Sequence, residues 1–352
     1  MTLCVFESAM RLDAVVGDAK DETWLALMRM LSAWVSGRIA IPSGLPIDHM
    51  DHTLITKLGG RPGLVLFSSG STGEPKAALH NAEKLMAKFR GIEAPPKRML
   101  FFMALDHIGG INTALHSLAT GGTLVTVKDR KPETVCAAIE KHRVQVLPTT
   151  PTFLNMLLMS GAWRDRDLSS LELITYGTEP MPAVTLEAAT KAFPGVRFKQ
   201  TYGLSELGIL QTKSKADDSL WMKVGGPGYE TRVVDGLLEI KADSAMLGYL
   251  NAASPFTDDG WFRTGDAVEV DGEWMRVLGR RSEIINVGGE KVYPAEVESL
   301  LMEIPGISAA VVSGEANCLM GQLVRAKVKV STGETAGEVR KRIRGAWRAE
   351  PY

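Results

Sequence analysis

The stretch from Leu66 to Asn81 combines residue types that suit phosphate binding. Its sequence, LFSSGSTGEPKAALHN, places serine, threonine and glycine directly after an apolar run and follows them with a lysine. Backbone N–H groups in a glycine-rich turn can receive phosphate oxygens, hydroxyls add directed hydrogen bonds, and a lysine supplies a mobile positive charge. The residues of these types are Ser68, Ser69, Gly70, Ser71, Thr72, Gly73 and Lys76, and they become the predicted phosphate-binding residues if the stretch is such a loop.

The spacing within this loop excludes the P-loop of the common nucleotide hydrolases. That motif requires a glycine directly before its lysine and a serine or threonine directly after it. Here Pro75 precedes Lys76, and Ala77 follows it. A loop rich in serine and glycine is also typical of an ordinary surface, so the rest of the chain must decide between the two interpretations.

Four further stretches follow the loop along the chain. They are YGTEPMP from Tyr176, TYGLSELG from Thr201, WFRTGD from Trp261 and GRRSEIINVGGEKVYPAEVE from Gly279. In type and order, the five motifs resemble those of the adenylate-forming superfamily, which includes acyl-CoA synthetases, adenylation domains of peptide synthetases and luciferases. The resemblance extends from roughly residue 60 to the last residue and is closest to acyl-CoA ligases.

The resemblance implies a two-step reaction that uses ATP and Mg2+. A carboxylate attacks the α-phosphate to form an acyl-adenylate and pyrophosphate, and a thiol of CoA or of carrier-protein phosphopantetheine then displaces AMP. Such chemistry depends on positioning and on neutralising charge as it develops. Glu206 corresponds to the magnesium-binding glutamate, with the hydroxyl of Thr72 nearby, and oxygen ligands suit this hard cation.

The resemblance also assigns the nucleotide site. Tyr202 would stack on the adenine, and the backbone of Gly177, Thr178 and Glu179 would line the other side of the base. Asp266 would accept hydrogen bonds from the ribose hydroxyls, for which a carboxylate has two acceptor oxygens, and Arg280 would join it.

The sequence ALDHIGGIN resembles the acyl-CoA synthetase motif in which a histidine lies between the acid and the thiol path. His107 is therefore the second predicted catalytic residue beside Glu206. Peptide-synthetase adenylation domains place an aspartate in this region, and Asp106 is adjacent, so an amino-acid substrate is the alternative. The predicted acyl pocket contains His107, Ile108, Gly109, Gly110, Thr175, Gly203, Leu204 and Gly208.

The last seventy or so residues resemble the family's mobile terminal domain. The resemblance places a hinge at Ser282, where Asp or Lys is usual, and a thiol tunnel at Gly288 and Gly289. Both ends appear shortened against the family pattern, and the late PxxxxGK lysine would come after the final RAEPY. A catalytically impaired nucleotide-binding or acyl-binding homologue is therefore a further alternative.

The elements that must position these residues follow an α/β pattern. Apolar runs at 63–69, 98–104, 123–127, 144–148, 171–177 and 196–203 predict strands, and 78–91, 132–143 and 182–193 predict helices. We expect an α/β fold whose large body, residues 1–279, has mainly parallel sheets covered by helices and then a small β section. A small mobile α+β domain follows at 280–352, with Val297, Leu300, Leu301 and Ile304 on one helical face.

Composition favours small-molecule substrates over macromolecular partners. The chain of 352 residues has a formal net charge of -1, so it offers no reason to expect nucleic acid or an anionic membrane as a partner. The N-terminal residues show no signal-peptide pattern, and we expect a cytoplasmic protein. The expected partners are a small carboxylic acid and either CoA or an acyl carrier protein.

Overall fold

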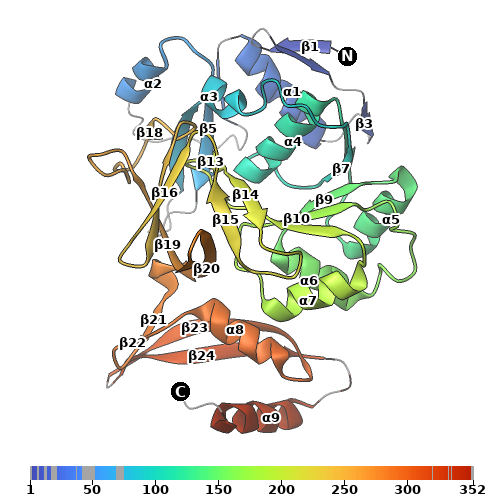
Figure 1. Ribbon diagram of the computed structural model, residues 1–352, viewed down its shortest axis with the longest axis vertical. Coiled ribbons are helices and arrows are strands. Elements are labelled where there is room, and N and C mark those ends of the chain that lie inside the picture. Colours follow the sequence, from blue (N-terminus) through green and yellow to red (C-terminus); the bar gives the residue numbers. More distant parts are fainter. Residues whose placement is uncertain are drawn as a thin grey trace.

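The computed structural model describes residues 2–5, 8–11, 14–16, 22–36, 38–41, 52–68, 75–318, 320–331, 333 and 335–349. Figure 1 shows a large body built from several sheets and, at the lower end of the view, a smaller unit formed by the last part of the chain. The predicted loop residues Ser69, Gly70, Ser71, Thr72 and Gly73 lie outside the described residues.

The body contains a parallel sheet of six strands. Its order is β11-β10-β9-β7-β8-β3, and each paired neighbour runs parallel. The strands are β3 (Ala14–Val16), β7 (Arg98–Phe101), β8 (Thr123–Thr126), β9 (Val146–Thr149), β10 (Leu173–Tyr176) and β11 (Arg197–Gln200). Buried leucine, isoleucine and valine side chains fill this sheet, as expected for strands covered on both faces.

Four helices connect or follow these strands. They are α4 (Ile108–Thr120), α5 (Pro132–His142), α6 (Pro151–Ser160) and α7 (Ala183–Ala192). Helix α6 shows how the sequence sets such boundaries, because Thr150 accepts a hydrogen bond from the Phe153 N–H at 3.1 Å and proline occupies the first turn. It ends at Ser160, and the C-cap residue Gly161 has a left-handed backbone.

The predicted phosphate loop connects two antiparallel strands rather than a strand and a helix. Strand β5 (Gly63–Ser68) pairs with β6 (Lys76–Asn81), and Ser68 lies opposite Lys76 in the register. The prediction of a helix from residue 78 was therefore wrong for its first residues, and α3 (Ala82–Ala87) begins only after Asn81, whose side chain caps it. The strands β4 (Ile39–Ala40) and β18 (Gly248–Tyr249) complete this sheet, in the order β18-β6-β5-β4.

An antiparallel sheet forms the β section that the sequence predicted. Its order is β14-β15-β20-β19-β17-β16. The strands are β14 (Gln211–Ser214), β15 (Met222–Gly225), β16 (Tyr229–Val234), β17 (Leu237–Ala242), β19 (Phe262–Asp271) and β20 (Trp274–Arg280). A short hairpin, β12 (Gly203–Leu204) and β13 (Gly208–Ile209), lies between the parallel and antiparallel sheets in the chain and carries Glu206 at its turn.

The terminal unit has a sheet and a hydrophobic cluster of its own. The sheet order is β22-β21-β24-β23, from β21 (Ile285–Val287), β22 (Glu290–Val292), β23 (Ile307–Asn317) and β24 (Gly321–Val330). Helix α8 (Pro294–Glu303) packs against β23, and α9 (Ala336–Ala349) follows the sheet. The 3-10 helix η1 (Arg281–Glu283) connects the unit to β20.

A few polar contacts join this unit to the body. The side chain of Asn155 donates to the Ser308 carbonyl at 3.3 Å, and the Ala183 N–H donates to Ser299 Oγ at 3.3 Å. Figure 1 shows α8 below α6 and α7, in agreement with these contacts. The division of the chain at 279 and 280 stays a prediction.

The remaining described elements lie in the N-terminal part. They are β1 (Thr2–Val5), β2 (Ser8–Arg11), α1 (Glu22–Val35) and α2 (His52–Leu58). None of the helices in the described part of the chain combines the length and the apolar composition that crossing a membrane requires. The predicted α/β class, with a helix-covered parallel sheet followed by an antiparallel β section and a small α+β unit, is confirmed.

Candidate nucleotide and acyl site

Tyr249 brings the two ends of the phosphate loop next to the predicted magnesium ligand. Its Oη donates a hydrogen bond to Glu206 Oε1 at 2.6 Å, and both side chains are buried. On the other side, Lys76 Nζ lies 5.6 Å from the centroid of the Tyr249 ring. Burial raises the pKa of Tyr249, and the Glu206 charge adds to this effect, whereas a hydrogen bond with Ser68 opposes it. Ser68, Lys76 and Glu206 thus all lie next to the Tyr249 side chain.

Asn251 fixes the point where the loop returns to the sheet. Its Oδ1 accepts a hydrogen bond from the Ala77 N–H at 2.8 Å, and its Nδ2 donates to the Pro75 carbonyl at 3.0 Å. The Asn251 side-chain amide therefore pairs with a backbone acceptor just before Lys76 and with a backbone donor just after it. Asn251 lies two residues after Tyr249, the last residue of β18, so the same short segment contacts both the loop and Glu206.

The His80 side chain forms a hydrogen bond with the backbone next to Glu206. It is fully buried on β6, and its Nε2 forms a 2.6 Å hydrogen bond with the Ser205 carbonyl, to which a protonated Nε2 donates. Burial lowers the pKa of His80 to about 4, although the Ser205 hydrogen bond and the Glu206 charge act in the opposite direction. The ring is therefore neutral near pH 7 and serves as a hydrogen-bonding support.

Tyr202, Asp266 and Arg280 form the second cluster that the sequence predicted. Tyr202 Oη donates to Asp266 Oδ2 at 2.5 Å, and Arg280 Nε lies 3.1 Å from Asp266 Oδ1. The contact follows from the sheet, since Asp266 on β19 and Arg280 on β20 are register partners. Burial raises the pKa of Asp266, and the hydrogen bond from Tyr202 and the charge of Arg280 oppose that shift.

The YGTE segment begins where β10 ends. Gly177 is required there because a Cβ atom would lie 2.4 Å from Thr201 Oγ1 and 2.6 Å from the Thr201 carbonyl oxygen. Thr178 has a left-handed backbone with φ of 75° and an exposed side chain. Glu179 Oε1 accepts a hydrogen bond from the Thr152 N–H at 2.6 Å, in the first turn of α6. The structure thus directs the Glu179 side chain to a helix, and the predicted role of this segment concerns its backbone.

His107 occupies the N-cap position of α4, where its side chain is 68% exposed. Its Nε2 lies 3.7 Å from Asp106 Oδ1. The histidine typical of acyl-CoA synthetases and the aspartate that would favour an amino-acid substrate are therefore neighbours. The two glycines that follow allow a close approach of the chain, because a Cβ on Gly110 would lie 2.2 Å from the Ala104 carbonyl oxygen, and one on Gly109 would lie 2.5 Å from Met103 Cε.

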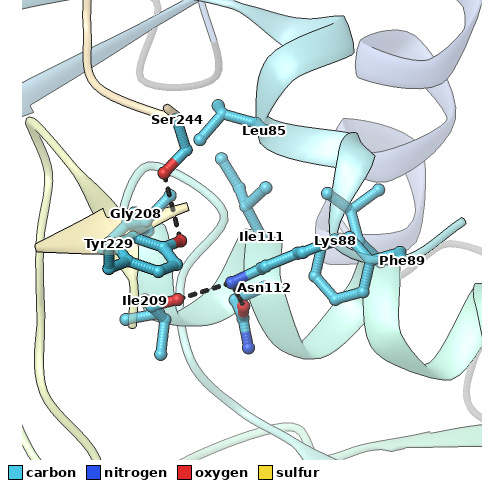
Figure 2. A pocket seen from close by; sticks show the side chains of 11 residues that line it. Leu85, Lys88, Phe89, Ile111, Asn112, Gly208, Ile209, Tyr229 and Ser244 are labelled. Atoms are coloured by element: carbon cyan, nitrogen blue, oxygen red, sulfur yellow. Dashed lines mark hydrogen bonds between the residues drawn. The ribbon is translucent and has the colours of Figure 1, made fainter. Parts of the chain in front are cut away.

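A narrow pocket opens between α3, α4, β13 and β16. Figure 2 shows its side chains, with Lys88 pointing between Asn112 and the Ile209 carbonyl. Of the predicted acyl-pocket residues, Ile108 and Gly208 line it. Those that do not line it are His107, Gly109, Gly110, Thr175, Gly203 and Leu204. Its other lining residues, which the sequence did not indicate, are Leu85, Lys88, Phe89, Ile111, Asn112, Leu115, Ile209, Tyr229 and Ser244.

The predicted acyl residues outside this pocket have structural surroundings of their own. Leu204 is buried in the cluster that also contains Tyr202. Gly203 has no room for a side chain, since a Cβ would lie 2.4 Å from Ile209 Cδ1. Thr175 is half-buried within β10.

The predicted hinge and tunnel residues lie on the surface of the terminal region. Ser282 is exposed within η1, between the two sheets. Gly288 and Gly289 form the turn between β21 and β22 with φ of 59° and 98°, which favours glycine. The Gly288 N–H donates to the Met320 carbonyl at 2.8 Å, which fixes the turn against the loop before β24.

The chemistry of Glu206 fits a magnesium ion bound together with phosphates. Only Oε1 has a hydrogen-bond donor among the described residues, which leaves Oε2 for a ligand. A buried carboxylate beside the predicted phosphate loop would supply one hard oxygen ligand to Mg2+. Thr72, the predicted second ligand, lies outside the described residues.

Tyr249, Asn251 and His80 are the residues near the loop that sequence reasoning missed. Tyr249 and Asn251 follow Gly248 in the stretch MLGYLN, which carries no chemical signal of its own. His80 belongs to the opening stretch, but its position on a buried strand could be expected only once β6 was known to pair with β5.

Comparison with known proteins identifies the family. The family model described as AMP-binding enzyme matches residues 57–257. The chain is 31% identical to indoleacetate–CoA ligase from Aromatoleum aromaticum over 81% of this chain and 61% of that protein. The chain thus spans about 60% of the length of the curated relatives it matches.

Solved structures agree with this result. The amide bond synthetase McbA from Marinactinospora thermotolerans superposes with a TM-score of 0.68 and 27% identity, over 80% of this chain and 61% of that chain. An o-succinylbenzoate CoA synthetase from Bacillus subtilis, in complex with an acyl-adenylate intermediate, superposes with a TM-score of 0.64 and 26% identity, over 80% of this chain and 62% of that chain. The expected resemblance is confirmed: the chain belongs to the AMP-binding enzymes of the adenylate-forming superfamily and is close to their acyl-CoA ligases.

Proposed function

We propose that this protein contributes to ATP-dependent activation of a carboxylic acid and its transfer to a thiol. The carboxylate oxygen attacks the α-phosphorus of ATP, pyrophosphate leaves, and the product is an acyl-adenylate. The sulfur of CoA, or of carrier-protein phosphopantetheine, then attacks the acyl carbonyl, and AMP leaves. The proposal rests on family membership and on the arrangement of the described residues around the loop.

One observation carries this proposal. Tyr249 joins the metal-binding candidate Glu206 to both ends of the phosphate loop, through its hydrogen bond and through the neighbouring Lys76 and Ser68. A buried anion for a cation and a lysine for phosphates are thereby fixed at one place. Such preorganised charge is what a reaction that develops negative charge on phosphate oxygens requires.

Mg2+ would be held by Glu206, with Thr72 as the second proposed ligand, and would neutralise phosphate charge. Lys76 would pair with the β- and γ-phosphates, which leave as pyrophosphate. Asp266 would accept hydrogen bonds from the ribose through the oxygens that Tyr202 and Arg280 now engage. His107, exposed at the N-cap of α4, would lie between the acid and the path of the thiol. CoA would approach along the turn of Gly288 and Gly289 after a movement of the terminal unit about Ser282.

The proposal is tested by measuring the release of AMP and pyrophosphate with ATP, Mg2+, CoA and a panel of acids with and without an α-amine. We expect acid-dependent release, and ATP–pyrophosphate exchange without CoA. Glu206→Gln should abolish metal-dependent adenylate formation while ATP binding persists. A matched control is Glu187→Gln on the exposed side of α7, whose carboxylate pairs with Lys191. Acid-independent release only, or unchanged activity of the Glu206 variant, would contradict the proposal.

A further inference from the structure

The hairpin that carries Glu206 is too short to hold it without contacts from outside. Strands β12 and β13 have two residues each, and Ser205, Glu206 and Leu207 form the loop between them. Within the hairpin, the Leu207 N–H donates to the Leu204 carbonyl at 3.1 Å. A two-stranded hairpin is at best marginally stable by itself in water. The position of Glu206 therefore depends on groups from other parts of the chain.

Three successive carbonyls of this loop, those of Ser205, Glu206 and Leu207, each accept a hydrogen bond from outside the hairpin. In that order, the donors are His80 Nε2 at 2.6 Å, the Met246 N–H at 2.7 Å and Ser244 Oγ at 2.6 Å. The first donor belongs to β6, and the other two belong to the connection between β17 and β18. Two separate segments of the chain thus hold the loop.

Ser244 is itself oriented by a further hydrogen bond. Its single hydroxyl proton points to the Leu207 carbonyl, so its oxygen accepts a hydrogen bond from Tyr229 Oη at 3.1 Å. Figure 2 shows the Tyr229 and Ser244 side chains facing each other. Hydrogen bonds connected in this way strengthen one another. Leu207 is fully buried and Ser244 nearly so, and water therefore cannot replace the hydroxyl without a change of structure.

We infer that Ser244 is a positioning residue for Glu206, the proposed ligand of Mg2+. The inference rests on the proposed function, because it concerns the same metal site. Mg2+ requires near-ideal octahedral geometry, so its affinity depends on where the carboxylate lies. Tyr249 holds one oxygen of that carboxylate, whereas His80 and Ser244 hold the carbonyls of the residues on either side. Groups that orient a ligand contribute to metal affinity although they do not touch the metal.

The test measures metal binding and not turnover. Mn2+, which takes the same oxygen ligands, is titrated into the protein with α,β-methylene-ATP, which cannot form an adenylate, and free Mn2+ is followed by electron paramagnetic resonance. Ser244→Ala should raise the Kd for Mn2+ about fivefold, while the Kd for the nucleotide in EDTA stays within about twofold of the wild-type value. Ser170→Ala is the matched control, because Ser170 Oγ also donates to a backbone carbonyl, that of Val144 at 2.8 Å.

A double-mutant cycle decides whether Ser244 acts through Glu206. Glu206→Gln should itself weaken Mn2+ binding, and Ser244→Ala added to it should cause no further loss. An equal loss in both backgrounds overturns the inference and leaves the proposed function intact. An unchanged Kd for Mn2+ in Ser244→Ala, or the same loss in Ser170→Ala, has the same meaning.

Tyr229→Phe decides should Ser244→Ala fail to fold. This variant removes the donor to Ser244 Oγ and leaves the bond to the Leu207 carbonyl, so the Kd for Mn2+ should rise less, about twofold. An unchanged Kd would then overturn the inference. If the wild-type protein binds the nucleotide but no Mn2+, the proposed metal site fails and the inference with it. If it binds neither, the proposed function itself fails.

Discussion

The hydroxyl of Tyr249 donates to Glu206 Oε1 at 2.6 Å, across 43 residues of chain. Through this contact, the carboxylate is held in one orientation, and its other oxygen is left for a ligand. Tyr249→Phe should keep the fold and weaken metal use, with the Mg2+ concentration for half-maximal adenylate formation rising roughly tenfold. A magnesium titration of ATP–pyrophosphate exchange measures this.

The control for that variant removes a hydroxyl elsewhere. Tyr293→Phe, at the start of α8 in the terminal unit, should leave the magnesium titration unchanged. If Tyr249→Phe alters the maximal rate alone, with an unchanged magnesium midpoint, Tyr249 does not position the metal ligand.

Asn251 should affect ATP affinity through the loop that it fixes. Asn251→Leu removes the acceptor for the Ala77 N–H and the donor for the Pro75 carbonyl, and we expect the KM for ATP to rise about tenfold. Asn251→Asp keeps the acceptor and loses the donor, so it should give an intermediate value. A common KM for both variants and the wild type would show that the loop does not depend on these bonds.

Asp266 should govern affinity for the ribose. Asp266→Asn replaces one of two acceptor oxygens by a donor that faces Arg280 or Tyr202, so AMP should bind about tenfold more weakly. Asp271→Asn, at the exposed end of the same strand, is the matched control and should bind AMP as the wild type does. Comparison of AMP with 2′,3′-dideoxy-AMP by calorimetry checks the assignment, since the variant should no longer distinguish them.

His80 should make the fold sensitive to acid. Its pKa is about 4 in the folded protein and 6.5 when unfolded, so between these values only the unfolded state takes up the proton. The free energy of unfolding should therefore decrease as the pH falls from 6.5 to 4, by up to about 3 kcal/mol from this group. Urea unfolding at several pH values measures the slope.

His80→Gln should have a shallower slope over this range than the wild type. His142→Gln, at the C-terminal end of α5, removes a partly exposed histidine and should retain most of the wild-type slope. An unchanged slope in the His80 variant would mean that other groups cause the acid sensitivity.

Local patterns predicted much of the fold. The six apolar runs named from the sequence contain β5, β7, β8, β9, β10 and β11, or most of their residues, and α5 and α7 agree within one residue. Helix α4 was missed because its sequence opens with Ile108, Gly109 and Gly110, and glycine weakens a helical pattern. Strand β6 was read as helix because LHNAEKL has helical spacing, whereas pairing with β5 determines its first residues.

The motifs named several residues that the structure places close together, but they did not predict the contacts between them. Tyr202, Asp266 and Arg280 were named together, and the structure brings them within hydrogen-bonding range. Asn251 lies 174 residues from Ala77, so no spacing rule could place it at the loop. In the terminal unit, Val297 and Leu301 are buried as predicted, whereas Leu300 is 49% exposed because it falls at the edge of the helical face.

The segment of Tyr249 to Asn251 has a consequence for how ligands act on one another. Asn251 forms a hydrogen bond with the end of the loop that returns to β6, and Tyr249 forms one with the Glu206 carboxylate. Tyr249 also belongs to β18, which pairs with β6. A ligand that orders one of these partners therefore restrains the other. Thermodynamic linkage then requires that nucleotide and cation strengthen each other's binding by equal factors, through a protein segment as well as through their own contact.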